Sequence, residues 1–171
     1  SMGAADINNI TQKFIEALLK TGAIDQIHIM LSEINPNLEK IGELINKNKQ
    51  VNIIRHFNIS AEELIELLKI CDLAICPAST IAIEICATGL GLISGYTANN
   101  QLGILNGLIK HKAIINFEDM NEINVDEIRS RLKSFINHPE MFNELVKNQK
   151  TIIDGDSPSR ILTIFIDLKN I

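Results

Sequence analysis

This sequence of 171 residues has few aromatic residues and no CxxC motif. It has no Trp and one Tyr, and its three cysteines, Cys71, Cys76 and Cys86, do not form a CxxC pair. An odd number of cysteines in apolar surroundings favours reduced, buried thiols, and so a cytoplasmic protein. The same spacing argues against a zinc site and against a thioredoxin-like redox motif.

An excess of positive charge and long apolar runs are also missing. The net charge is −5, and no run of Lys or Arg exceeds two residues, whereas a nucleic-acid-binding protein would show a basic face. No apolar stretch reaches the roughly 18–20 residues of a membrane span, and no secretory signal opens the chain. With 46% apolar and 22% charged residues, the composition is that of a globular domain and not of a disordered chain.

Five short β-branched segments predict buried parallel strands. They cover residues 26–31, 51–55, 73–76, 91–94 and 113–116. The intervening segments have the apolar spacing of helices, and Ser60 with Glu63 forms a capping-box pattern. Pro36 is placed in the first turn of a helix. Strands alternating with helices predict βαβ units with right-handed crossovers, and so an α/β fold.

The sequence changes after Phe117, where only helical spacing follows. We therefore expect a single domain over residues 1–171, with a βαβ core in 1–117 and a helical part in 118–171. Pro139 is placed at the first position of a helix. For Ile161–Leu168, β-branched residues favour a strand, whereas the position after Pro158 favours a terminal helix, which is the prediction made here.

The start of the sequence does not fit a doubly wound sheet, which begins with a strand. We expect either that residues 1–3 are foreign to the protein or that a first strand precedes this fragment. The strands at 26–31 and 73–76 would then pair directly or accept a donated strand, from 161–168 or from a partner chain. An open gap would leave backbone groups unpaired, at about 1–3 kcal/mol each.

Common catalytic motifs are absent. There is no GxSxG elbow, no GxxxxGK[ST] loop and no dinucleotide-binding GxGxxG. The four histidines, His28, His56, His111 and His138, lack HExxH or HxH spacing and are expected to be structural. The sequence therefore predicts no catalytic residue and no metal ligand in this chain.

The most informative stretch runs from Cys71 to Gly89. A buried strand turns directly into a helix at Ser79 and Thr80, and the backbone N–H groups and two hydroxyls at such a helix start suit an anion. Glu84 falls on the same helix face as Thr80 and can accept hydrogen bonds from a ribose diol. The alternative stays open that Ser79 or Thr80 is only an N-cap and Glu84 only an exposed residue.

A second junction follows the next predicted strand, where Asn99-Asn-Gln101 begins another helix. Ligands of open parallel sheets bind at the carboxyl ends of the strands, where both junctions lie. Uncharged amides together with helix dipoles suit a diphosphate-linked sugar.

The pattern Ala78-Ser-Thr-x3-Glu-x2-Ala-x-Gly89, followed by Asn100-Gln101, resembles the C-terminal nucleotide-binding domain of GT-B proteins. It is similar in outline to the lipid II-forming N-acetylglucosaminyltransferase, and more closely to the UDP-sugar hydrolase of pseudaminic acid biosynthesis. The opening Met2-Gly-Ala-Ala-Asp6 and the Asp154-Gly loop with Arg160 belong to the same resemblance. It implies a Rossmann-like doubly wound parallel sheet, the C-terminal half of a GT-B fold, with extra C-terminal helices.

The resemblance also implies residue roles. Glu84 would bind the ribose, and Ser79 and Thr80 would bind the phosphates. Asn100 and Gln101 would contact the diphosphate or sugar, and the uracil would be bound by Phe57, Asn58 and Ile59. Gly3 and Asp6 would form the opening loop of the UDP-sugar site. Pro77-Ala78 replaces the usual glycine or serine pair, which would narrow the phosphate loop.

The parent protein implied by the resemblance is a UDP-sugar hydrolase of surface-glycan biosynthesis, with no cofactor and with its catalytic histidine in an N-terminal domain outside this chain. A GT-B glycosyltransferase and a non-catalytic interaction module are the alternatives. A homodimer is left open.

Overall fold

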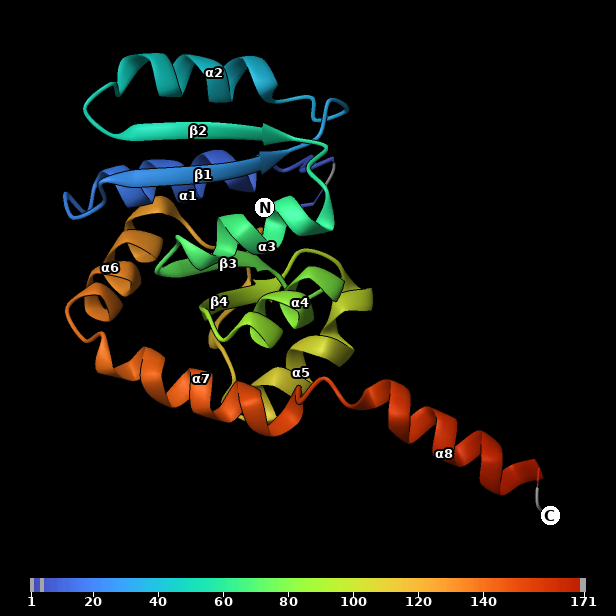
Figure 1. Ribbon diagram of the computed structural model, residues 1–171. Coiled ribbons are helices and arrows are strands. Elements are labelled where there is room, and N and C mark those ends of the chain that lie inside the picture. The colour runs from blue at the N-terminus through green and yellow to red at the C-terminus, as the bar shows by residue number, and fades with distance from the viewer. Residues whose placement is uncertain (1, 4, 170–171) are drawn as a thin grey trace.

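The computed structural model describes residues 2–3 and 5–169, which form an α/β domain (Figure 1). The strands are β1 (Gln26–Leu31), β2 (Asn52–Phe57), β3 (Leu73–Pro77), β4 (Gly91–Tyr96) and β5 (Ile115–Asp119). The helices are α1 (Ile10–Leu19), α2 (Leu38–Lys47), α3 (Ala61–Lys69), α4 (Thr80–Thr88), the 3-10 turn η1 (Asn99–Gln101), α5 (Leu102–Lys110), α6 (Val125–Ile136), α7 (Glu140–Ile152) and α8 (Ser157–Lys169). All five predicted strands are present, with ends that differ by up to three residues.

The strands form two separate parallel half-sheets. β1 pairs with β2, from Gln26 opposite Asn52 to Leu31 opposite Phe57, and β4 lies between β3 and β5. Within residues 2–3 and 5–169, no strand pairing joins β1 to β3. The predicted direct pairing of these two strands is therefore wrong. So is the alternative that residues 161–168 fill the gap, because they belong to α8 and confirm the expected terminal helix.

Helices cover both faces of the strands, and alternate strand residues serve two different cores. Ile93 of β4 packs with α1 and α6, whereas its neighbour Leu92 packs with α3, α4 and α5. Both side chains are completely buried. A third core lies between α1, α2 and the β1–β2 half-sheet. Burial on both faces explains why β4 does not alternate between apolar and polar residues.

Helix α1 spans the two half-sheets and holds them on either side of itself. Its Phe14 lies 5.9 Å from Phe117 of β5, measured between ring centroids, and belongs to the core of the three-stranded half. The next residue, Ile15, packs with Ile27 and Ile29 of β1. Helix α1 therefore contacts both half-sheets.

Helix α7 covers the amino ends of β4 and β5. Its Gln149 is fully buried, and the side-chain amide donates to the carbonyls of Leu90 (3.2 Å) and Ala113 (2.9 Å). Gly91 lies under the ring of Phe142, where a Cβ would come within 2.5 Å of the ring. The first strand residue of β4 must therefore be glycine for α7 to pack here.

The helix starts agree with the sequence in one case and differ in two. The capping box of Ser60 and Glu63 is present in full. Pro36 lies two residues before α2 and not in its first turn, because the Asn35 side chain accepts from the Asn37 N–H in a turn that precedes the helix. Pro139 is the N-cap of α7 and not its first residue, a one-residue difference typical of helix boundaries.

Helix α8 projects away from the rest of the domain (Figure 1). It buries none of its residues. Across the described part of the chain, no helix has the length and apolar character that a membrane crossing requires.

Candidate functional site

The loops that carry the candidate residues gather at one edge of the strands. Helix α3, nine residues or about 14 Å long, returns the chain from the end of β2 to the start of β3, so β3 runs in the same direction as β2. The carboxyl ends of all five strands therefore share one edge. This is where ligands of open α/β sheets bind.

The start of α4 presents backbone N–H groups at this edge. Ser79 is the N-cap, but its side chain makes no capping hydrogen bond. The N–H groups of Ala78 and Ala82 are used internally, by the carbonyls of Gly95 (2.7 Å) and Ser79 (2.9 Å). Those of Thr80 and Ile81, at the first helical positions, have no intrahelical acceptor. Two N–H groups thus lie at the positive end of the helix dipole, on a segment that also carries the hydroxyls of Ser79 and Thr80.

Glu84 lies one turn further along α4, on the face that begins at Thr80. Its side chain is exposed and forms no hydrogen bond or ion pair with any described residue. The carboxylate is therefore available to a ligand as a hydrogen-bond acceptor.

The junction after β4 is built by Gln101. Its side-chain carbonyl accepts from the backbone N–H of Thr97 (2.7 Å) and from the Thr97 hydroxyl (3.3 Å). This bond shapes the loop and leaves the Gln101 amino group as the available donor. Asn100, beside it in η1, is exposed. The predicted helix at residues 99–110 begins instead with a 3-10 turn, so both amides lie in that turn.

The predicted uracil contacts lie on the β2–α3 loop. Phe57 is 38% exposed, Asn58 adopts a left-handed backbone with φ 50°, and Ile59 packs against the α3–α5 core. An exposed ring beside backbone groups can stack on a base.

Asp6 organises the opening loop. Its two carboxylate oxygens accept from the backbone N–H groups of Ile10 (2.8 Å) and Thr11 (3.0 Å), and its carbonyl accepts from the Asn37 side chain (2.9 Å). The carboxylate is thereby engaged with the start of α1. Gly3, by contrast, is exposed and has a φ of 89°, a conformation that favours glycine.

Asn121 was not singled out from the sequence, yet it connects three segments of this edge. Its side chain donates to the carbonyl of Thr97 (3.2 Å) and accepts from the Asn8 amide (2.7 Å), and its backbone carbonyl accepts from Lys13 (2.7 Å). The one local signal is Asp119, whose carboxylate accepts from the Asn121 N–H (2.9 Å). The long-range contacts leave no trace in the sequence spacing.

Negative charge gathers at the ends of β4 and β5. Partial burial raises the pKa of Tyr96, and the neighbouring carboxylates Asp119, Glu118 and Glu122 raise it further. These carboxylates make the end of β5 less favourable for an anion than the start of α4. Within the described residues, no group of three or more His, Cys, Asp or Glu side chains is placed to hold a metal ion.

The thiols are unsuited to nucleophilic chemistry. Burial raises the pKa of Cys76 to about 11 and that of Cys86 to about 12, so both stay protonated near neutral pH. Cys71 is only half-buried, in contrast to the prediction that all three are buried.

His28 and His56 face each other from β1 and β2, with the Nδ1 atom of His28 2.9 Å from the Nε2 atom of His56. Arg160 forms a two-bond ion pair with Asp154 (2.7 and 3.0 Å).

Comparison with solved structures shows the fold. The chain is similar to MurG of Acinetobacter baumannii, with a TM-score of 0.59 and 14% identity over 88% of this chain and 46% of that chain. It is also similar to the glycotransferase of kitacinnamycin, with a TM-score of 0.53 and 18% identity over 88% of this chain and 38% of that one. The domain is thus a Rossmann-like half of a GT-B fold, and it spans less than half the length of either structure.

No protein-family model matches the sequence, and no curated protein does.

Proposed function

We propose that this chain is the nucleotide-sugar-binding half of a GT-B glycosyltransferase. The observation that carries the proposal is the start of α4, where two N–H groups without intrahelical acceptors lie one turn from Glu84. The Glu84 carboxylate is exposed and has no partner among the described residues. The phosphates of a UDP-sugar bind at the helix start, Glu84 accepts from the ribose hydroxyls, and Asn100 and Gln101 donate to the diphosphate or sugar. Phe57, Asn58 and Ile59 contact the uracil.

The GT-B structures favour this glycosyltransferase reading over the UDP-sugar hydrolase of pseudaminic acid biosynthesis that the sequence resembles. The two differ in whether an acceptor sugar or lipid is required. In either case the general base comes from a second domain, because no histidine or thiol is positioned as a base or nucleophile at this edge within the described residues. The isolated chain therefore binds UDP but does not turn over UDP-sugars.

Titration calorimetry with UDP and UMP tests the site. UDP binds more tightly than UMP, because the helix start addresses the diphosphate. Glu84→Ala weakens UDP binding by about 1–3 kcal/mol, or roughly 5- to 150-fold in Kd. The matched control is Glu144→Ala, which removes an exposed glutamate from α7.

An unchanged Kd for Glu84→Ala would remove the ribose role. Absence of any UDP binding would favour a non-catalytic interaction module instead.

A further inference from the structure

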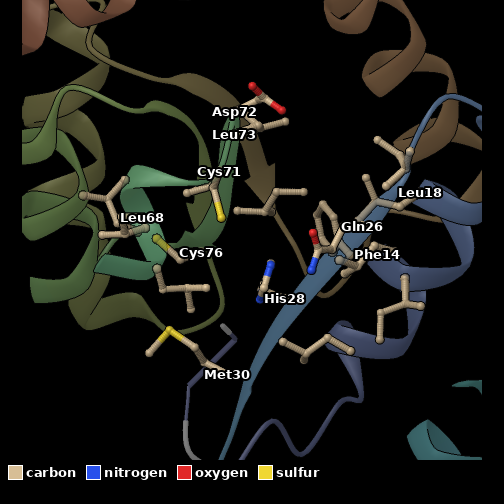
Figure 2. A pocket seen from close by; sticks show the side chains of 18 of the residues that line it. Phe14, Leu18, Gln26, His28, Met30, Leu68, Cys71, Asp72, Leu73 and Cys76 are labelled. Carbon is tan, nitrogen blue, oxygen red and sulfur yellow. The ribbon is translucent and has the colours of Figure 1, made fainter. Parts of the chain in front are cut away.

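Asn121, in the loop between β5 and α6, is attached to helix α1. Phe14 and Leu18 of this helix line a cleft of about 400 Å³ between the half-sheets, as Figure 2 shows, and Phe14 is buried. The residue before Phe14, Lys13, donates from Nζ to the backbone carbonyl of Asn121 (2.7 Å). The Asn121 backbone is therefore fixed to a helix that packs on both half-sheets.

The segment before Asn121 lies tightly against the end of β4. The backbone N–H of Met120 donates to the Tyr96 carbonyl (2.9 Å). A Cβ on Gly95 would come within 2.5 Å of the Glu118 carbonyl oxygen, so a larger residue at position 95 would push the two segments apart. The loop that carries Asn121 is thus held close to the loop between β4 and α5.

Three partners orient the Asn121 side chain. Its Nδ2 donates to the Asp119 carboxylate (2.8 Å) and to the Thr97 carbonyl (3.2 Å), and its Oδ1 accepts from the Asn8 amide (2.7 Å). A carboxylate and a carbonyl accept hydrogen bonds but do not donate them, so the nitrogen of the Asn121 amide must face both. The amide therefore has one orientation.

Thr97 in turn orients the side chain of Gln101. The backbone N–H (2.7 Å) and the hydroxyl (3.3 Å) of Thr97 both donate to the Gln101 Oε1. A backbone N–H only donates, so the Gln101 amide must turn its oxygen toward Thr97 and its amino group away from it. A ligand group that meets Gln101 here is therefore a hydrogen-bond acceptor.

The two sets of hydrogen bonds meet at Thr97. Its N–H and hydroxyl hold Gln101, and its carbonyl is held by Asn121. A residue bound at both of its backbone polar groups supports a neighbouring side chain in one place, as the surroundings of a preorganised site do. Loss of the Asn121 amide frees the Thr97 carbonyl, and the support of Gln101 is weakened.

We propose that Asn121 is a positioning residue of the nucleotide-sugar site. Through the Thr97 carbonyl it holds the β4–α5 loop so that the Gln101 amino group faces the diphosphate or sugar. This role rests on the proposed function, in which Gln101 touches the ligand and Asn121 does not.

Nuclear magnetic resonance of the ligand-free chain tests the link between the two side chains. In Asn121→Ala, the order parameter of the Gln101 side-chain NH2 group is expected to fall by at least about 0.2. The matched control is Asn8→Ala, which removes another hydrogen bond of the Asn121 amide and leaves its contact with Thr97 in place. This control is expected to leave the Gln101 order parameter unchanged.

Titration calorimetry with UDP-N-acetylglucosamine tests the consequence for binding. Asn121→Ala is expected to weaken binding about 3- to 10-fold, whereas Asn8→Ala leaves the Kd unchanged. In a chain that already carries Gln101→Ala, the further change Asn121→Ala is expected to weaken binding less than about twofold, because the group that Asn121 positions is gone.

An unchanged Gln101 order parameter in Asn121→Ala would overturn the positioning role and leave the proposed function intact. So would an equal loss of affinity from Asn121→Ala with and without Gln101. A Gln101→Ala chain that binds the UDP-sugar as tightly as the native chain would remove Gln101 from the site and overturn the proposal as well. Absence of UDP and UDP-sugar binding by the native chain would instead overturn the proposed function, and this role with it.

Discussion

The two half-sheets differ in how they are held. In the three-stranded half, β4 is buried on both faces, and α7 binds the amino ends of β4 and β5 through Gln149. In the two-stranded half, β2 is at best half-buried along its whole length, and the main apolar core lies on the α1–α2 face alone. The three-stranded half is therefore more extensively packed than the two-stranded half, and α1 contacts both.

The proposed binding residues are divided between these parts. The start of α4 and Gln101 belong to the three-stranded half, whereas Phe57 and Asn58 follow β2 in the other. We therefore expect the phosphate contacts, which lie on the better-packed half, to dominate the affinity for UDP.

The largest expected effect is a loss of core packing in the three-stranded half. Ile93→Ala removes a fully buried side chain and is expected to cost about 2–5 kcal/mol in the free energy of unfolding. Ile53→Ala in β2, where the side chain is half-buried, is expected to cost about 1–2 kcal/mol. Urea denaturation measures both. Equal losses would show that the two half-sheets are equally supported.

A smaller effect is expected at the α7 contact, which serves the three-stranded half alone. Gln149→Leu leaves the carbonyls of Leu90 and Ala113 without this donor, at about 1–3 kcal/mol each. The Gln149 Oε1 is itself buried and accepts no hydrogen bond from a described residue, so its removal offsets part of the loss. The expected net cost is about 1–2 kcal/mol.

The control for Gln149 is Asn148→Ala, which removes a surface hydrogen bond to Lys112. It is expected to change the free energy of unfolding by less than about 0.5 kcal/mol. A Gln149→Leu protein as stable as this control would mean that α7 does not fasten the strand ends.

Acid is expected to weaken the two-stranded half slightly. Burial, and then the neighbouring His56, lowers the pKa of His28 below its ordinary value of 6.5. Between that lowered pKa and 6.5, the unfolded chain binds more protons at this position than the folded one, so stability falls as pH drops through this window. Because His28 is partly exposed, solvent screening keeps the effect small.

Thermal melting at pH 7.5 and 5.5 measures this effect. The native chain is expected to lose about 1–2 °C more in Tm than His28→Gln does over the same interval. His111→Gln, a change outside the His28–His56 pair, should behave as the native chain. A His28→Gln protein with the native pH dependence would exclude the pair as its source.

Sequence reasoning located the strands because each is a β-branched run between helical segments, and it placed Ser79, Thr80 and Gln101 at strand ends for the same reason. The contacts by which α1 joins the two half-sheets, Phe14 on one and Ile15 on the other, could not be predicted in this way. The Asn121 contacts and the His28–His56 pair were missed on similar grounds. They join residues 24 to 113 positions apart, and polar pairing at that range has no periodicity.

The smallest expected effect concerns α8, which belongs to neither half-sheet. Six large apolar side chains on it are each more than half exposed, from 52% at Ile166 to 66% at Phe165. A helix of 13 residues without buried contacts is marginal in water, so its amides are expected to exchange rapidly. A chain that ends at Asp156 is therefore expected to melt within about 1 °C of the full chain. A chain that ends at Pro139, and so also lacks Leu145 and Gln149, is expected to melt far lower. A fall in Tm of more than about 5 °C on removal of α8 alone would mean that its apolar residues are buried in solution. The helix would then pack against one of the two half-sheets.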